Sequence, residues 1–385
     1  MKSPLSLTAG VAALAITTLL TAYPIHAYST PATDAAAPIA KGVKWLVEHQ
    51  AEDGSFSNPQ FPGLSGLALW AVAASGDPAY AKAVRKGSDF LLGNVQPDGG
   101  IYTVIPGRKG GGLSTYNTAI SLTALVASGR DDITEVVLNA RTFLANSQHI
   151  GDDPFDGGFG YDKSTDRAYT DLMNTHFVIE SMRRSQSFED KRPAGQKRAD
   201  INWSQALKYA ESLHNGPDTG DNAGGFVYNP SDAKAGIEKK AEGTLGLETE
   251  GGEKIIMRSY GSITYAGLLS LIYCEVDKTD PRVQSALDWA SKHWTLEENP
   301  GMGDQGLYFF YNVMGRAMST VGMDSIPRKS GPAIQWNADL IAKVASLQAE
   351  DGSWVNKNGR FWENDPVLAT AYAVLSLEFA SGTTK

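Results

Sequence analysis

The chain has 385 residues, a net charge of −9 and a single cysteine, Cys274. The acidic balance argues against a nucleic-acid partner, because phosphate binding needs clustered Lys and Arg side chains that the sequence lacks. One cysteine excludes an intramolecular disulfide and any zinc site built on several cysteines. Glycine is frequent, with 40 residues, and the positions of these glycines reveal a repeat.

Residues 1–27 have the layout of a secretory signal peptide. Lys2 is followed by an apolar run through Leu20, and the small residue Ala27 ends the segment. The run is too short and too lightly flanked for a membrane span. We therefore expect a secreted or periplasmic protein. No later stretch reaches the roughly 20 continuous apolar residues of a transmembrane helix, so no transmembrane segment is expected.

Residues 28–385 contain six copies of one pattern and are expected to form a single domain. In the first copy Ile39, Val43 and Leu46 fall at i, i+4 and i+7, the spacing of one helical face. Each such helix ends in a glycine turn, where a positive φ is expected. The clearest copies span residues 40–56, 83–102 and 340–354, and the looser copies span residues 139–159, 206–226 and 286–307.

A second helix is expected after every turn. These segments are rich in small, weakly polar residues that allow close packing, so we expect them to lie inside the first set. One position recurs as Thr, Ser or Tyr in all six: Ser65, Thr118, Thr175, Thr264, Tyr311 and Thr370. Six helix pairs could stack as an open solenoid or close into a ring. Because no repeat has the polar face of a cap, the expected fold is all-α, an α6/α6 toroid with the inner helices around a central cavity.

The repeat resembles that of a known superfamily. Gln50-Ala51-Glu52-Asp53-Gly54-Ser55-Phe56 and the matching segment ending at Trp354 are similar to the QW motif of squalene and hopene cyclases. The GGF variants, at residues 157–159 and 224–226, resemble those of protein prenyltransferase β subunits. The resemblance covers nearly all of residues 28–385. It implies an α6/α6 toroid whose cavity holds an isoprenoid, and it implies that the Asp-Gly turns are structural.

Asp152–Asp156 reads DDPFD and fits the DDxxD pattern by which many isoprenoid enzymes hold magnesium. Such a motif needs a helix, so that residues i, i+1 and i+4 share a face. Pro154 and the Gly157-Gly158 pair disfavour a helix here. Gly157 also occupies the position of the repeat glycine. The segment is therefore predicted to be a turn and not a metal site.

Two catalytic signatures that the resemblance implies are incomplete. Class II terpene cyclases protonate their substrate with the central Asp of a DxDD motif, and residues 171–174 read Asp-Leu-Met-Asn, so Met173 stands at the position of the proton donor. Protein prenyltransferases bind zinc through Asp, Cys and His, but Cys274 lies in an apolar helical face with no convincing His partner. We therefore expect no metal and no other cofactor.

The candidate catalytic residues are Asp171, Asn174 and His176. Asp171 and Asn174 share one helical face with Thr175 and would form a polar cluster if that face borders the cavity. Two alternatives remain open: Asp171 as a helix cap, and His176 as a side chain satisfied between helices. Aromatic rings near the inner helices could stabilise carbocations or could pack in the core, and at least one ring of residues 306–312 should reach the cavity. The candidate cavity residues are Asn117, Tyr116, Thr175, Tyr260, Tyr308, Tyr311, Asn312 and Trp362.

Residues 229–254 form a charged, glycine-rich insertion that predicts a surface loop or hairpin, acting either as a lid or as an inert insertion.

Three functions are compatible with the sequence. They are an enzyme acting on a polyprenyl or triterpenoid-like substrate, a non-catalytic binding module for a hydrophobic or extended ligand, and a carbohydrate-active toroid. The expected partner is an isoprenoid-like hydrophobic small molecule.

Overall fold

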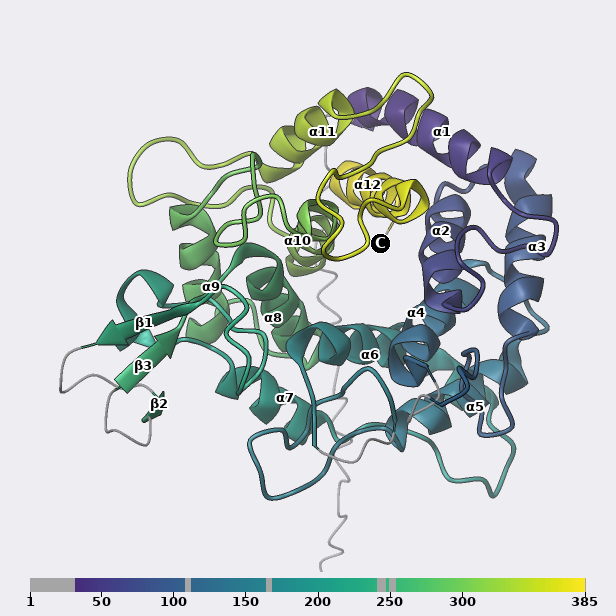
Figure 1. The fold of residues 1–385 in the computed structure, drawn as a ribbon, viewed down its shortest axis with the longest axis horizontal. Coiled ribbons are helices and arrows are strands. Elements are labelled where there is room, and N and C mark those ends of the chain that lie inside the picture. The colour runs from purple at the N-terminus through teal and green to yellow at the C-terminus, as the bar shows by residue number, and fades with distance from the viewer. Residues whose placement is uncertain (1–31, 108–111, 164–167, 241–246, 249–253, 385) are drawn as a thin grey trace, which may run out of the picture.

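The computed structural model describes residues 32–107, 112–163, 168–240, 247–248 and 254–384, so the predicted signal peptide lies outside the described residues. Helices dominate the described chain and alternate between two concentric layers (Figure 1). The outer helices are α1 (Ala32–Glu48), α3 (Ala81–Leu92), α5 (Thr134–Ala145), α7 (Trp203–Ser212), α9 (Pro281–Lys292) and α11 (Trp336–Ser346). The inner helices are α2 (Pro62–Ala74), α4 (Ser114–Ala127), α6 (Leu172–Arg184), α8 (Gly261–Tyr273), α10 (Leu307–Val321) and α12 (Pro366–Ser381). Three short 3-10 helices, η1 (Pro78–Tyr80), η2 (Gln186–Lys191) and η3 (Pro217–Asn222), lie in the described connections.

The ring is closed. Each inner helix packs against the next, and the last, α12, packs against α2 and α1 at the start of the chain. Figure 1 shows α11 beside α1 in the outer layer and α12 beside α2 in the inner layer. The predicted all-α toroid is therefore confirmed, and the open solenoid is not formed.

The repeat glycines allow each turn to pack closely against the next outer helix. Gly54, Gly99, Gly157, Gly224 and Gly352 have φ between 87° and 98°, as the turns were predicted to require. A Cβ atom on each would lie 2.1–2.8 Å from a carbonyl oxygen of the next outer helix. For Gly352 that oxygen belongs to Lys41 of α1, so the sixth turn packs on the first helix by the same contact. The glycine is needed both for the backbone conformation and for the close approach.

The recurrent Thr, Ser or Tyr of the inner helices ties each helix to its turn. The Thr175 hydroxyl accepts a hydrogen bond from the Phe159 amide at 3.0 Å, and Thr118, Thr264, Thr370 and Ser65 accept equivalent bonds at 2.8–3.1 Å. In the fifth repeat the Tyr311 hydroxyl donates to the Leu296 carbonyl at 2.6 Å. Thr175 and Tyr311 were predicted to face the cavity. The structure instead directs both hydroxyls to the turns, because the buried backbone groups there need a partner.

The DDPFD segment is a turn, as predicted. The Asp153 carboxylate accepts from the Phe155 amide at 2.8 Å and pairs with His149 at 2.8 Å, while Asp156 accepts from the Gly151 amide at 3.0 Å. These two carboxylates therefore accept hydrogen bonds from groups within the turn itself. In the part of the chain that the structure describes, no group of three His, Cys, Asp or Glu side chains is placed to hold a metal ion.

The insertion at residues 229–254 contributes a small antiparallel sheet beside the toroid (Figure 1). Strand β1 (Ile237–Lys240) pairs with β3 (Lys254–Met257), and β2 (Leu247–Glu248) pairs with the other edge of β3. The sequence predicted a surface loop or hairpin, and the described part of the segment forms this three-stranded sheet. Among the described helices, none combines the length and the apolarity that crossing a bilayer would need.

Replacing Gly157 by Ala should lower the free energy of unfolding by about 2–4 kcal/mol, because the new Cβ meets the Gln205 carbonyl at 2.1 Å in a backbone conformation with φ 87°. Gly129→Ala is the matched control. Its φ is also positive, at 68°, but no atom lies within 4 Å of the added Cβ, so the expected loss is about 1–2 kcal/mol. Urea unfolding of the three proteins measures the difference. Equal losses at both positions would contradict the packing role of the repeat glycine.

Candidate ligand-binding cavity

A cavity of about 430 Å³ lies at the N-terminal ends of the inner helices. Leu113, Tyr260 and Gly306, which precede α4, α8 and α10, contribute to its wall. This volume is in the range of small-molecule sites, which hold ligands in clefts of about 300–1,000 Å³. The toroid therefore encloses a ligand-sized space where the loops before the inner helices meet.

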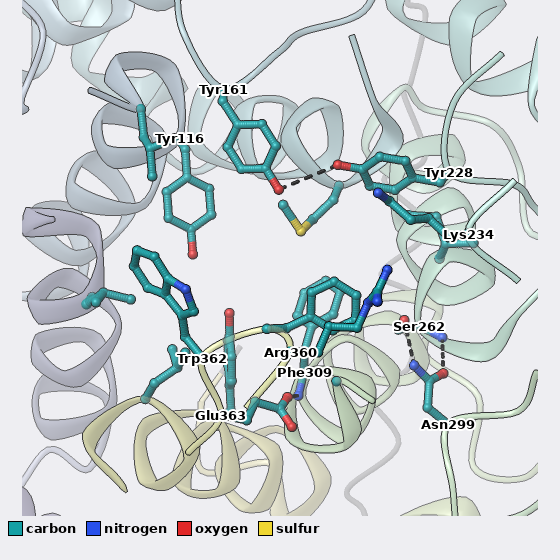
Figure 2. Close-up of a pocket in the computed structure, with 18 of the residues that line it drawn as sticks. Tyr116, Tyr161, Tyr228, Lys234, Ser262, Asn299, Phe309, Arg360, Trp362 and Glu363 are labelled. Atoms are coloured by element: carbon teal, nitrogen blue, oxygen red, sulfur yellow. Dashed lines mark hydrogen bonds between the residues drawn. The ribbon is translucent and has the colours of Figure 1, made fainter. Parts of the chain in front are cut away.

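The wall of the cavity is predominantly aromatic (Figure 2). Leu64, Met173, Ile263 and Leu368 add aliphatic surface between the rings. Such a wall suits an apolar or unsaturated ligand, and its ring faces can also attract positive charge. The aromatic residues of the wall are Phe61, Tyr116, Tyr161, Tyr228, Tyr260, Phe309, Phe361, Trp362 and Tyr372.

Two large rings at the mouth are open to solvent. The side chains of Phe361 and Trp362 are 41% and 45% exposed, and the Trp362 ring packs edge-on against Phe61 at 4.9 Å between ring centroids. Trp362 has a φ of 64°, which is strained for a bulky residue. Its amide donates to the Gly359 carbonyl and its carbonyl accepts from the Asp365 amide. Strain of this kind is typical of ligand clamps, so this loop is a candidate contact for the ligand.

Glu363 fastens the same loop to α10. Its carboxylate accepts from the amides of Phe309 at 2.7 Å and Tyr308 at 3.2 Å, and from the side chain of Asn356 at 2.8 Å. Burial raises the pKa of Glu363, and these hydrogen bonds oppose the rise. The contact orients the backbone of Phe309, whose ring lines the cavity. The prediction that at least one ring of residues 306–312 reaches the cavity is therefore confirmed.

Three of the predicted cavity residues, Tyr116, Tyr260 and Trp362, line this cavity. Asn117 is engaged elsewhere: its amide oxygen accepts from the Gly63 amide at 2.9 Å and its amide nitrogen donates to the Gly112 carbonyl at 3.0 Å. The remaining predicted residues are buried outside the wall. Tyr308 packs edge-on against Tyr311, and the Asn312 amide has no hydrogen-bond partner among the described residues.

Asp171 is the N-cap of α6, so the alternative that it caps this helix is confirmed. Its carboxylate accepts from the Asn174 amide at 2.8 Å and from the Asn174 side chain at 2.7 Å. The side chain is fully buried and lies outside the described cavity lining, whereas Met173 lines the cavity. Burial raises the pKa of Asp171 to about 6, although hydrogen bonds from Asn174 and Tyr228 oppose the rise.

A group of tyrosine hydroxyls connects Asp171 with the cavity wall, because Tyr228 hydrogen-bonds Asp171 and also lines the cavity. The Tyr228 hydroxyl is 3.2 Å from that of Tyr169 and 3.5 Å from that of Tyr161, and Figure 2 shows the last contact on the cavity wall. Burial raises the pKa of Tyr161 and Tyr228 above the usual range, and the charge of Asp171 adds to the shift. These phenols therefore stay protonated at neutral pH and offer hydrogen bonds.

His176 belongs to a buried charged network behind the aromatic wall. Its Nε2 is 3.1 Å from a guanidinium nitrogen of Arg316, and Arg316 is ion-paired with Glu180. Glu180 also accepts from Arg184 at 2.9 Å and from the Tyr273 hydroxyl at 3.2 Å. Burial, followed by the charge of Arg316, lowers the pKa of His176 to about 3. His176 is therefore a neutral acceptor between α6 and α10, as the structural alternative predicted.

Several wall residues were missed at the sequence level, chiefly Tyr161, Tyr228, Lys234, Arg360 and Glu363. A signal existed for the two tyrosines. Each stands two residues after the aromatic of a GGF turn, in GGFGY and GGFVY. The other three lie in loops outside the repeat, where the periodicity gives no position.

No family profile matches the chain, and no curated protein matches it by sequence. Solved structures do match its fold. The type II terpene cyclase MstE from Scytonema superposes with a TM-score of 0.55 and 13% identity over 92% of this chain and 100% of that chain. Protein geranylgeranyltransferase-I from Candida albicans, complexed with GGPP, gives a TM-score of 0.52 and 12% identity over 89% of this chain and 90% of that chain. The protein thus has a terpene cyclase and prenyltransferase-like fold.

Asp171→Asn should change how stability depends on pH. Because the folded state holds the Asp171 proton up to about pH 6 while the unfolded chain releases it near pH 4, wild-type stability falls across this window. The asparagine removes this loss. We expect the unfolding free energy of wild type, relative to the variant, to fall by about 2 kcal/mol between pH 4 and pH 7. Urea titrations at both ends of the window measure it, and a constant difference would show that Asp171 is ionised throughout.

Proposed function

We propose that this protein binds an isoprenoid-like apolar ligand in the cavity at the centre of its toroid. The observation that carries the proposal is the aromatic wall around about 430 Å³ of space. The fold gives further support, since a structure of MstE was obtained with its substrate, geranylgeranyl dihydroxybenzoate, and the Candida enzyme with GGPP. We also propose that the chain is exported, on the layout of residues 1–27.

Binding is better supported than protonation-driven cyclisation. The position of the proton donor in the DxDD motif holds Met173, whose thioether can donate no proton. Asp171 is committed to capping α6. Glu363 does line the cavity, but its carboxylate accepts two backbone amides and one side-chain amide. The carboxylates of Asp171 and Glu363 are therefore engaged in hydrogen bonds that stabilise the fold.

Calorimetric titration with farnesol, a C15 isoprenoid alcohol, tests this proposal. Wild type should bind it, and Met173→Trp should weaken binding at least tenfold, because the indole fills the space between the rings. An unchanged melting temperature would show that the variant is folded. Absence of binding to wild type, or unchanged affinity in a folded Met173→Trp protein, would contradict an apolar site here.

A carbohydrate is the second candidate. The exposed Trp362 and Phe361 rings at the mouth could stack on a sugar, and the phenol hydroxyls of Tyr161 and Tyr228 could bind its hydroxyls. Titration with soluble oligosaccharides separates the two functions. If a sugar binds, Trp362→Ala should abolish that binding, whereas farnesol should still bind to the deeper rings.

A further inference from the structure

Two cationic side chains enter the cavity from different loops. Lys234 comes from the insertion that follows the fourth repeat turn, and Arg360 comes from the loop before α12. Figure 2 shows their charged ends pointing into the same part of the cavity. Like charges directed at one space repel each other, and an anion between them would remove the repulsion.

The charges around the two cations leave one of them unneutralised. Lys234 pairs with Asp232 at 2.5 Å and lies over the Tyr228 ring at 4.8 Å. The Arg360 guanidinium lies over the Phe361 ring at 5.6 Å and has no ion pair or hydrogen bond to any described residue. The carboxylate of Glu363 in the described wall already accepts hydrogen bonds from the Tyr308 and Phe309 amides and from the Asn356 side chain.

We propose that the ligand is an amphiphile carrying one carboxylate or phosphate, and that this group binds between Lys234 and Arg360 while the apolar tail lies against the aromatic rings. A guanidinium fork and an ammonium group suit both oxyanions. Because Arg360 and the exposed Phe361 and Trp362 mark the mouth, the head group faces outward and the tail inward. This inference rests on the proposed function, and it adds the chemistry and orientation of the ligand.

The arrangement also predicts a salt dependence. Lys234 is 24% exposed and Arg360 is at the surface, so dissolved ions can screen their attraction for an anion. Binding of an anionic amphiphile should therefore weaken as salt is raised. Binding of a neutral ligand with the same tail should not.

Three ligands with one C15 tail test the inference by calorimetry: farnesol, farnesoic acid and farnesyl monophosphate. Wild type should bind at least one anionic ligand tenfold or more tightly than farnesol. Lys234→Gln and Arg360→Gln should each reduce this preference, the ratio of anionic-ligand affinity to farnesol affinity, at least threefold. Arg328→Gln is the control, because Arg328 lies outside the cavity lining and the charge loss is the same. The anion preferred by wild type identifies the head group.

The outcomes separate this inference from the proposed function. The head-group site is overturned, and the apolar site stands, if farnesol binds and the anionic ligands bind no more tightly than farnesol. The same conclusion follows if Arg328→Gln reduces the preference for the anionic ligand as much as Arg360→Gln. If none of the three ligands binds to wild type, the proposed function fails and this inference fails with it.

Discussion

Glu180→Ala should lower the free energy of unfolding by about 3–5 kcal/mol, the usual result of removing one partner from a buried ion pair. Glu180 is 1% exposed and neutralises Arg316 and Arg184, which come from α10 and α6. Without it, the partners left to the fully buried Arg316 among the described residues would be His176 and the faces of nearby rings. Chemical denaturation at pH 7 measures the loss.

Two comparisons identify the cause of that loss. Glu275→Ala removes a carboxylate that pairs with Arg183 but is 77% exposed, and it should cost no more than about 1 kcal/mol. Glu180→Leu combined with Arg316→Met should recover most of the stability, since it removes both buried charges and keeps apolar volume. A double variant as unstable as Glu180→Ala would show that packing, and not unpaired charge, dominates at this position.

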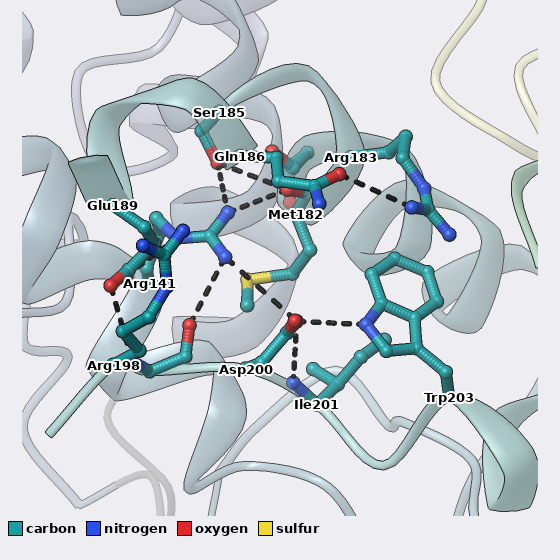
Figure 3. A network of polar contacts seen from close by, with 12 residues as sticks. Arg141, Met182, Arg183, Ser185, Gln186, Glu189, Arg198, Asp200, Ile201 and Trp203 are labelled. Atoms are coloured by element: carbon teal, nitrogen blue, oxygen red, sulfur yellow. Dashed lines mark hydrogen bonds and ion pairs between the residues drawn. The ribbon is translucent and has the colours of Figure 1, made fainter. Parts of the chain in front are cut away.

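Arg141→Ala should also cost about 3–5 kcal/mol, because Arg141 on α5 clamps the segment between α6 and α7 (Figure 3). Its guanidinium donates to Glu189 at 2.9 Å, to the Ser185 hydroxyl at 2.8 Å and to the Ala199 carbonyl at 3.0 Å. Both charged side chains are at least 98% buried. Alanine at this position leaves the Glu189 carboxylate with Arg192 as its ion-pair partner and the Ala199 amide as a further hydrogen-bond donor.

The pH dependence of this second loss is opposite to that at Asp171. Burial opposes ionisation of Glu189, but hydrogen bonds from Arg192 and Arg141 lower its pKa to about 2. The stability that the pair supplies is present above about pH 4.5 and is lost as the pH falls toward 2. The deficit of Arg141→Ala should shrink over that range. Arg198→Ala is the control, since its ion pair with Asp190 is exposed, and it should change stability by less than about 1 kcal/mol at every pH.

The repeat was enough to predict the helices and their two layers, because each part of it acts locally. A glycine at a turn with φ near 90° and an apolar face at helical spacing restrict the chain wherever they occur. The sequence also excluded a helical DDxxD site, since Pro154 and the following glycines prevent a helix whatever surrounds them. The prediction that Met173 stands at the position of the DxDD proton donor likewise came from the motif alone.

The direction of each side chain was harder to predict. Thr175 and Tyr311 share a repeat position near the cavity end of the inner helices, yet their hydroxyls turn outward to buried backbone groups. Asp171 was readable as either a cap or a cavity residue. In the structure Asp171 lies outside the cavity lining and is hydrogen-bonded to Tyr228, which lines it. Tyr228 and its neighbour Tyr161 come from the fourth and third turns.

The sequence by itself therefore determined the repeat, the two helical layers and the glycine turns, all of which depend on spacing within one repeat. Only the tertiary structure decided which residues share the cavity. Lys234 and Arg360 lie in non-repeating loops, and Arg316 meets Glu180 across 136 positions of the chain. Closing the ring brings such distant segments together, and a buried charge such as that of Arg316 needs a partner of opposite charge. Neither condition is visible in the periodicity of the sequence.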